Sequence, residues 1–371
     1  MRRVILGVVL GAGLLAVLVP TAGVRAALPA TPVDPVPLCG ATGGIDADVP
    51  PSKLRVATYN VLHTQTNEGD QTLDARIPLL VDALASARVD VAGLQEVAST
   101  ANHGNVVERL ATGLAQRTAH RWHWCWFQSN PHFPGEPDLQ PGGGGGPLTE
   151  LMASQVRAGE ARWAEGLAVV SRIPISETSV FRMPPRSYEG VACVPPDPLD
   201  CNAAAVFDSR AVLRARLTTP NGPLDLYNTH LAHGLTPLSD TTKRVHVNVV
   251  LAYIGQTAAA DPTPDVLVGD FNSVEGSAVY ADVTGAGFVD TFRSTAPGAN
   301  GFTSSQDVLT DTSAPTASRR IDFVFAKPGG CGLAVKSSEV IGDAAAPFGD
   351  GRWVWPSDHY GVVSELRCAR S

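Results

Sequence analysis

Acidic, amide and histidine side chains recur at the ends of apolar, β-branched segments in this 371-residue chain. Any one of them could cap a helix or form a turn. Charged residues are rarely buried in such segments, however, unless they are paired or bound to a metal. Six clusters of this kind therefore predict one shared site. The clusters are Asn60 in VATYN, Glu96 in VAGLQE, Asn228 and His230 in LDLYNTH, Asp270 and Asn272 in VLVGDFN, Asp322 in RIDFVF, and Asp358 and His359 in SDHYGV.

The oxygen donors in these clusters are typical of a site for a hard divalent cation. Glu96, Asp270 and Asp358 supply carboxylates, and Asn60 and Asn272 supply neutral amide oxygens. Such a set suits Mg²⁺, Mn²⁺ or Ca²⁺ rather than a structural zinc ion. We expect Mg²⁺, with Mn²⁺ and Ca²⁺ as the alternatives.

The two histidines of the set, His230 and His359, need partners that fix their tautomer and their pKa. Candidate acids are Glu165 in AEGLAVVSR and Asp322 in RIDFVF. A cation, paired imidazoles and amides are suited to attack by water on a phosphoester, because the cation and donors stabilise the growing charge while acid and base groups move protons. This chemistry requires no activated serine or cysteine.

The segments that carry these residues predict a mixed fold of strands and helices. Apolar residues at helical spacing occur within 77–84 and within 245–256, the second with Ser239 or Asp240 as its N-cap. Many strands with few helices indicate a mixed α/β or α+β domain with more than one sheet. The strand candidates are KLRVATYNVL, DVAGLQEV, RWHWCWF with one aromatic face in the core, GLAVVS, AVLRARL, LDLYNTH, DVLVGDF, RIDFVF and HYGVVSEL.

The chain opens with the residue order of a secretory signal peptide. Basic residues precede an apolar stretch shorter than a usual membrane span, and a small-residue cleavage site follows at Ala26. We expect residues 1–26 to be removed on secretion to the extracellular space, residues 27–52 to form a mobile Pro-rich tether, and residues 53–369 to form one domain. The Gly-rich insert at 128–150 is either functional or disordered.

The charge of the chain argues against one class of nucleic-acid-binding protein. Removal of the three arginines in residues 1–26 leaves 25 basic and 36 acidic residues, a formal charge of −11. A protein that binds nucleic acid mainly through its electrostatic field should be basic. A negative chain can still act on phosphates if a bound cation supplies local positive charge.

All six cysteines follow the expected cleavage site, and an even number in an exported chain favours three disulfides. Cys193 and Cys201 bracket a short loop and form the expected local pair. The other four cysteines allow three pairings, of which we expect Cys39 with Cys125 and Cys331 with Cys368.

Seven motifs occur in a fixed order along the chain: TYNV, LQEV, EGLAVVSR, NTHL, GDFNS, RIDFVF and SDHYGV. Together they resemble the motif series of the endonuclease/exonuclease/phosphatase superfamily, which includes deoxyribonuclease I, abasic-site endonucleases, sphingomyelinases and inositol-polyphosphate 5-phosphatases. The resemblance covers Lys53 to Arg367. It implies a four-layered α/β (α+β) sandwich of two mixed β-sheets flanked by helices, with a metal-dependent phosphoester hydrolase site at one edge of the sheets.

The resemblance also implies a role for each motif residue. Asn60, Glu96 and Asp358 match metal-site residues, with Glu96 as the principal ligand. The remaining matches are catalytic: His230 contacts the phosphate and is a candidate general acid, Asp270 and Asn272 orient or deprotonate the attacking water, and His359 is paired with Asp322.

Two further residues resemble positions of the deoxyribonuclease-like branch alone. Glu165 resembles the acid that partners the first histidine, His230. Arg210 resembles a phosphate-contacting arginine that follows a small disulfide loop, as the loop between Cys193 and Cys201 would here. A solvated charge at a strand entrance is the alternative reading of Arg210.

We therefore expect a secreted, divalent-metal-dependent phosphoesterase, monomeric, with DNA as the favoured substrate. A sphingomyelinase-like phospholipid phosphodiesterase, an inositol-phosphate phosphatase and a non-catalytic binding protein are the alternatives. Trp353 and Trp355 precede the SDH motif and either line the substrate mouth or pack beneath it. The remaining histidines, including His63 and His233, match no family motif, and we expect structural roles for them.

Overall fold

The computed structural model describes residues 37–46, 53–64, 67–100, 103–132, 163–183, 210–234, 237–261, 263–306, 308–327, 333–349 and 351–368. The expected signal segment, most of the Gly-rich insert, the loop that carries Cys193 and Cys201, and Cys331 lie outside these ranges, so the predictions for them stay predictions. No helix in the described ranges is long and apolar enough to span a membrane.

In the part of the chain that the structure describes, the first sheet has eight strands, and β2 and β3 pair in parallel. The last strand of the chain, β16, lies between β2 and β13 rather than at an edge. In spatial order the strands are β1 (Leu38–Ala41), β5 (His123–His132), β6 (Trp163–Ser171), β3 (Val91–Thr100), β2 (Leu54–Asn60), β16 (Gly361–Cys368) and β13 (Leu333–Ile341), with β4 (Gly104–Asn105) paired to β3.

The second sheet has six strands and is also mixed, because β9 and β10 are parallel and their other neighbours are antiparallel. A separate hairpin of β14 (Ala346–Phe348) and β15 (Arg352–Val354) precedes the SDH motif. In spatial order the strands of the second sheet are β11 (Val289–Asp290), β12 (Asp322–Lys327), β10 (Asp265–Asp270), β9 (Gly222–His230), β8 (Ala211–Thr219) and β7 (Ile175–Arg182).

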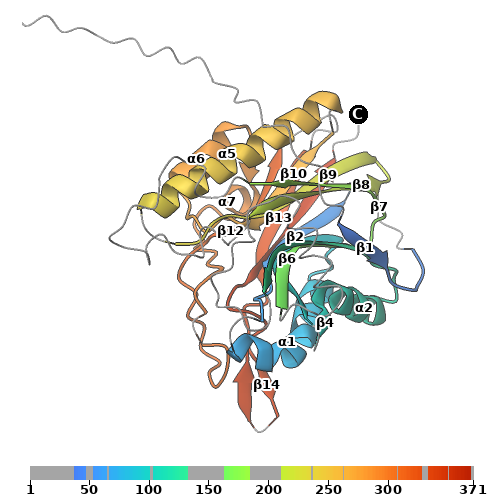
Figure 1. The fold of residues 1–371 in the computed structure, drawn as a ribbon, viewed down its shortest axis with the longest axis vertical. Helices are drawn as coiled ribbons and strands as arrows, with labels where there is room; N and C mark the ends of the chain where they lie inside the picture. The colour runs from blue at the N-terminus through green and yellow to red at the C-terminus, as the bar shows by residue number, and fades with distance from the viewer. Residues whose placement is uncertain are drawn as a thin grey trace, which may run out of the picture.

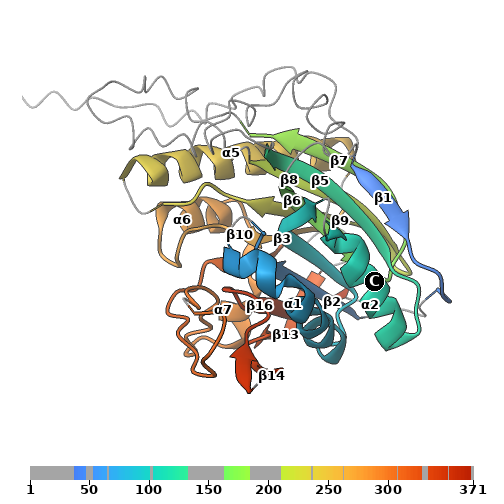
Figure 2. The same cartoon turned by 60° about the horizontal axis from the view of Figure 1, so that its bottom comes forward.

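The two sheets pack face to face, and helices cover their outer faces (Figure 1). The shared interior is lined by side chains such as Val56 and Val169 from the first sheet and Leu226 and Val268 from the second. Helices α1 (Asn67–Ser86) and α2 (Val106–Thr118) pack on the first sheet, and α5 (Pro237–Ala260) and α6 (Ala278–Gly285) on the second. Figure 2 shows the same layers from a second direction. The short helix α7 (Thr291–Thr295) contacts β12. The predicted sandwich of two mixed sheets is confirmed.

Residues 123–127 of the aromatic segment RWHWCWF begin β5, Trp122 immediately precedes it, and the three tryptophans lie in the core as predicted. Trp122, Trp124 and Trp126 are buried beneath α1 and α2, in the cluster formed with Leu80, Leu110 and their neighbours. The alternation arises because successive side chains of a strand point to opposite faces. The other eight predicted strand segments are also strands of the two sheets.

The tether prediction does not hold for Leu38–Ala41. These residues form β1 and pair with β5, and a disulfide joins Cys39 to Cys125 at directly opposite positions. The cross-link and the ladder together attach this segment to the edge of the first sheet. The predicted pairing of Cys39 with Cys125 is therefore confirmed.

Helix α5 begins at Pro237, two residues before the predicted N-cap Ser239. Proline is favoured in the first turn of a helix, because its missing N–H would have no partner there. Helix α2 was not predicted. Its N-cap Asn105 accepts a hydrogen bond from Val107 N (3.1 Å), and its buried side chains follow helical spacing from Val106 to Leu114.

Candidate active site

The registers of the two sheets bring the polar strand ends to one edge. In the second sheet, Asp270 at the end of β10 lies between His230 at the end of parallel β9 and Asp322 at the start of antiparallel β12. In the first sheet, Asn60 and Gln95 are opposite each other in β2 and β3, so Glu96 follows at the same edge. The Asn60 amide Nδ2 donates to Glu96 Oε1 (2.9 Å) and to Asp270 Oδ2 (3.1 Å), which links the two sheets at the site.

A histidine–carboxylate pair forms one side of this site. His359 Nδ1 and Asp322 Oδ2 are 2.9 Å apart, and His359 Nε2 lies 3.8 Å from Asp270 Oδ2. Asp322 is held in turn because Thr303 Oγ1 accepts the Asp322 backbone N–H (3.2 Å). Burial lowers the pKa of His359, but Asp322 outweighs it and raises that pKa well above its usual value. The pair therefore favours a cationic imidazole whose Nε2 faces Asp270.

His230 occupies the other side of Asp270. Its Nε2 lies 3.1 Å from Asn272 Nδ2 and 3.4 Å from Asp270 Oδ2. Asn272 adopts a left-handed backbone conformation (φ 47°), and its N–H donates to Asp270 Oδ1 (2.8 Å). Close approach explains the glycine of GDFN, because a Cβ on Gly269 would lie 2.1 Å from the Thr229 carbonyl oxygen of the adjacent strand.

Glu96 is presented by an irregularity in β3. The pairing of β3 with β6 shifts between Leu94 and Val97, and Glu96 between them has a positive φ of 57°. Such bulges re-aim a side chain that a regular strand would direct elsewhere. Burial raises the pKa of Glu96, but His63, His230 and the Asn60 hydrogen bond outweigh it and lower that pKa to about 2. Glu96 is thus an anion at neutral pH.

Burial makes ionisation of two other carboxyl groups of the site, Asp270 and Asp358, less favourable. Burial and the neighbouring Asp322 raise the pKa of Asp270 to about 7, although His359 opposes them. Burial raises the pKa of Asp358, which is half-buried; His359 opposes this effect and Glu96 adds to it. The excess of buried acid and the oxygen-rich donor set fit a divalent cation, which would stabilise the ionised forms. Among the described residues, Asp322 Oδ1 is buried and accepts no hydrogen bond.

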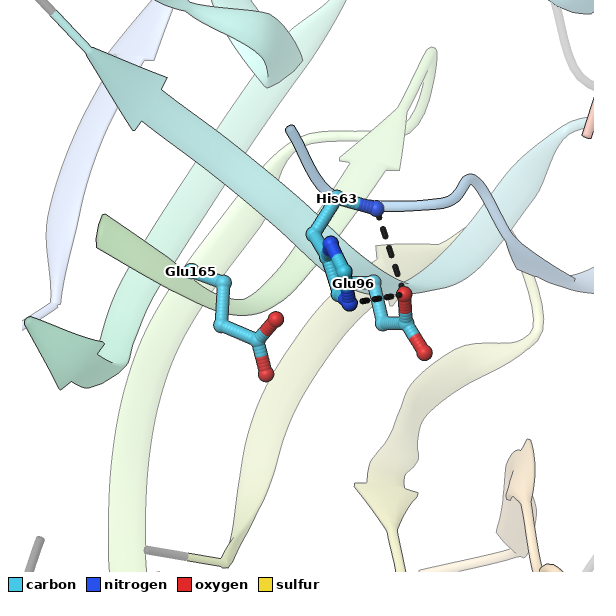
Figure 3. A group of neighbouring side chains, drawn as sticks. All are labelled: His63, Glu96 and Glu165. Carbon is cyan, nitrogen blue, oxygen red and sulfur yellow. Dashed lines mark hydrogen bonds and ion pairs between the residues drawn. The ribbon is translucent and has the colours of Figure 1, made fainter. Parts of the chain in front are cut away.

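The structure brings eight of the ten predicted residues into this network of strand ends: Asn60, Glu96, His230, Asp270, Asn272, Asp322, Asp358 and His359. Glu165 lies on β6 beside Glu96 and His63 (Figure 3), with ligand atoms of the three residues within 4.8 Å of one another. Arg210 is buried immediately before β8, whose Val212 is opposite Thr229 near the end of β9. Arg210 is therefore not the solvated charge of the alternative reading.

Sequence reasoning missed Arg76, which is fully buried and holds the two loops of the site together. Its guanidinium donates to the carbonyl oxygens of Val61 (2.6 Å) and Leu62 (3.2 Å) after β2, and to that of Pro356 (3.3 Å) before the SDH motif. Ser357 Oγ adds a second link, by donating to the Asn60 carbonyl oxygen (2.7 Å). An arginine at helical spacing among apolar residues was the available signal for Arg76.

Lys243 of α5 is buried although it is a lysine. Its Nζ donates to the carbonyl oxygens of Gly234 (2.7 Å) and Asn272 (3.0 Å) and pairs with Asp240 (2.9 Å). It thus fixes the backbone that carries Asn272. Its neighbour Arg244 has an exposed side chain that pairs with Asp282.

The structure also bears on two expectations near the site, one for His63 and one for Trp355. His63 was expected to have a structural role, but its Nε2 lies 3.5 Å from Glu96 Oε2 in the predicted metal site. Trp355 is buried, stacks on Tyr360 and donates to the Thr312 carbonyl oxygen, so it packs beneath the site rather than lining its mouth. Trp353 is half-buried in β15.

Comparisons with known proteins agree with this geometry. Residues 57–359 match the model of the Endonuclease/Exonuclease/phosphatase family. The fold is similar to an endonuclease/exonuclease/phosphatase from Beutenbergia cavernae DSM 12333, with 22% identity and a TM-score of 0.58 over 86% of this chain and 72% of that one. It is also similar to a mannosyl-6-phosphatase from Bacteroides thetaiotaomicron VPI-5482 (16% identity, TM-score 0.53, 84% of this chain and 99% of that one).

A third similar structure is a humanized D. rerio TDP2 with 14 mutations (20% identity, TM-score 0.52, 85% of this chain and 98% of that one). At these identities the solved structures establish the fold alone. A search of curated protein sequences found no match.

Proposed function

The chain belongs to the Endonuclease/Exonuclease/phosphatase family. From this premise we propose that it hydrolyses a phosphodiester by attack of water, that the reaction depends on a divalent cation, and that DNA is the favoured substrate. The observation that supports this most directly is the position of Asp270. Its Oδ2 lies within 3.8 Å of the Nε2 atoms of both His230 and His359, and it accepts the Asn60 amide. The candidate base Asp270 thus lies next to two candidate acids, His230 and His359.

The proposed reaction assigns a proton to each of these groups. A water oxygen bonds to phosphorus as the bond from phosphorus to the leaving oxygen breaks. Asp270, whose pKa is raised to about 7 by burial and by Asp322, accepts the proton of the water. His230, whose Nε2 lies 3.4 Å from Asp270 Oδ2, supplies a proton to the leaving oxygen. His359, kept cationic by Asp322, donates to a phosphate oxygen.

The donor set suited to a cation lies on the first-sheet side of the same edge. Asn60, Glu96 and Asp358 are the proposed ligands, with Mg²⁺ as the favoured ion. When bound, the ion would polarise the phosphate and offset the negative charge of the buried carboxylates. Asn60 couples this side to Asp270, because one amide donates to both Glu96 and Asp270.

A substrate panel tests the proposal. Purified protein is assayed on plasmid DNA, RNA, sphingomyelin vesicles and inositol phosphates, with Mg²⁺ and with EDTA. We expect EDTA-sensitive cleavage of DNA, and a loss of about 10²-fold or more in kcat for His359→Ala. The matched control is His233→Gln, since His233 is exposed on the loop after β9 and should retain activity. No EDTA-sensitive turnover on any substrate would favour a non-catalytic binding protein instead.

A preference for DNA over other phosphoesters is supported by Arg210. Arg210 stands beside the strand that carries His230, where its guanidinium could contact a phosphate, and it offers local positive charge in an acidic chain. In Arg210→Met we expect KM for DNA to rise more than kcat falls. An unchanged KM would remove this support.

A phospholipid substrate is the second candidate, and the β14–β15 hairpin favours it. The hairpin projects from the body of the protein (Figure 1) and carries Phe348, which is 37% exposed, and the half-buried Trp353. Exposed aromatic side chains can enter a membrane interface. If sphingomyelin vesicles are hydrolysed in the panel and Phe348→Ser weakens vesicle binding without changing the hydrolysis of a soluble diester, this candidate replaces DNA.

We further propose that the protein is exported after cleavage near Ala26. The signal-like residues 1–26 and the disulfide between Cys39 and Cys125 support this, because such bonds persist in oxidising compartments. Expression of the full chain in a bacterial host, followed by N-terminal sequencing of the exported product, should give Ala27 as the first residue. Retention of the uncleaved chain in the cytoplasm would contradict export.

A further inference from the structure

Glu96 of the predicted metal set also meets two potential ligands outside that set, His63 and Glu165. His63 comes from the loop after β2, Glu96 from the irregularity of β3, and Glu165 from β6 (Figure 3). One ligand atom of each lies within 4.8 Å of the other two. Donors about 2.1 Å from one ion lie about 3 to 4 Å apart, so small side-chain adjustments would let all three reach the same cation.

His63 is presented to this position by a fixed backbone. Its own N–H donates to Glu96 Oε2 (3.1 Å). The two residues before it, Val61 and Leu62, are held through their carbonyl oxygens by the buried guanidinium of Arg76. Only 18% of the His63 side chain is exposed. Its ring is therefore positioned at the site rather than free on the surface.

The contact between the His63 ring and Glu96 has the length of an ion pair but not of a short hydrogen bond. Their closest ring-to-carboxylate separation, His63 Nε2 to Glu96 Oε2, is 3.5 Å, which is longer than the usual 2.7 to 3.2 Å of about linear N–H···O bonds. The same oxygen already accepts the His63 backbone N–H. The imidazole nitrogen instead faces two carboxylates from different strands, as a ligand of a shared ion would.

We propose that His63 Nε2 is a nitrogen ligand of the divalent cation, alongside Glu96 and Glu165. The inference rests on the proposed metal-dependent function and makes it more specific. Imidazole suits Mn²⁺, Co²⁺ and Zn²⁺ better than Mg²⁺ or Ca²⁺, which prefer oxygen ligands. The nitrogen donor therefore shifts the preference of the site from Mg²⁺ toward Mn²⁺.

The test is electron spin-echo envelope modulation of Mn²⁺ added to the metal-free protein, together with Mn²⁺ and Mg²⁺ titrations by calorimetry. We expect ¹⁴N modulation from a directly bound imidazole. In His63→Gln, which keeps a polar side chain of similar size, this modulation should be lost and the Kd for Mn²⁺ should rise about tenfold or more. The Kd for Mg²⁺ should change less than about threefold. His233→Gln is the matched control and should match the parent protein.

Glu165→Gln gives a second, independent variant. It should weaken Mn²⁺ binding while the ¹⁴N modulation from His63 persists. Thermal unfolding in EDTA checks that both variants are folded, and only folded protein enters the comparison. If folded His63→Gln keeps both the modulation and the Kd for Mn²⁺, the inference is wrong and the proposed function stands. If the parent protein binds neither Mn²⁺ nor Mg²⁺ and shows no EDTA-sensitive hydrolysis, the proposed function fails as well.

Discussion

Replacement of Arg76 by methionine should destabilise the protein and disable the site, because the Arg76 guanidinium donates to backbone carbonyls of two loops of the site. Methionine fills most of the volume of the arginine stem but donates no hydrogen bonds. It would leave the carbonyl oxygens of Val61, Leu62 and Pro356 without the donor that they now share. A buried acceptor that loses its partner costs about 1 to 3 kcal/mol. Allowing for entry of water, we expect the free energy of unfolding to fall by about 3 to 5 kcal/mol.

The effect on activity follows from where the three carbonyls lie. Two belong to the loop between Asn60 and His63, and the third precedes the turn that carries Asp358 and His359. Without Arg76, no guanidinium joins these two segments, so the distance between them is less fixed. A displacement of about 1 Å at reacting groups can cost about 10²-fold in rate, so we expect a loss of that order in kcat in the fraction that stays folded.

Urea unfolding followed by fluorescence, and kcat measured well below the unfolding midpoint, provide the assay. Arg76→Lys retains a charge but offers fewer and differently directed donors, so it should fall between the parent and Arg76→Met. Arg244→Met is the matched control, because Arg244 makes an exposed ion pair with Asp282 and should change stability by no more than about 0.5 kcal/mol. If Arg76→Met costs less than about 1 kcal/mol, or leaves kcat unchanged, the proposed role of Arg76 is refuted.

Substitutions of Asp322, Asp265 and Cys39 test three further features of the structure. Asp322→Asn removes the carboxylate that raises the pKa of His359. We therefore expect kcat to fall about 10²- to 10⁴-fold and the alkaline limb of the pH–rate profile to move to lower pH. An alkaline limb that does not move would contradict the pairing of His359 with Asp322. Burial and the nearby Asp225 raise the pKa of Asp265 to about 6. The folded state therefore binds the proton of the Asp265 carboxyl more tightly than the unfolded state does. The free energy of unfolding should fall as pH rises from about 4 to 6. Asp265→Asn should therefore be more stable than the parent above pH 6, by up to about 3 kcal/mol, with no difference below about pH 4 in urea titrations. Cys39→Ser should lose about 2 to 4 kcal/mol, and a reductant should destabilise the parent more than this variant.

The strands that carry the site could be predicted because their sequences are locally unambiguous. All six residues of β10, Asp265–Asp270, are buried, and the segment reads as an apolar run bounded by polar residues. β13 (Leu333–Ile341) gave no such signal, since more than half of its residues are at least partly exposed. Its place in the sheet depends on pairing with β16, a contact between segments that neither sequence specifies alone. β1 likewise depends on β5, to which a disulfide also ties it.

The residues of the candidate site likewise divide into those that the sequence predicts and those that depend on contacts between remote segments. The acids, amides and histidines at strand ends were predictable as a set, because charged residues are rarely buried unless they are paired or bound to a metal. Arg76 and Ser357 were not, because their partners are remote in sequence. Arg76 reaches Pro356 across 280 residues of sequence, and Ser357 reaches Asn60 across 297. His63 follows a motif in sequence, yet only the arrangement of β3 and β6 places carboxylates around it.

The sequence by itself determined the chemical groups of this protein and the strands on which most of them lie. Hydrophobic patterning and motif order are local properties, so they can be read without knowing which segments meet. The tertiary structure decided which groups act on one another. The parallel register of β9 with β10 and the antiparallel register of β10 with β12 place Asp270 between His230 and Asp322. The packing of one sheet on the other lets the Asn60 amide reach Asp270. Register and sheet packing are set by the whole buried core, because moving a strand by one residue would turn its apolar side chains to the opposite face.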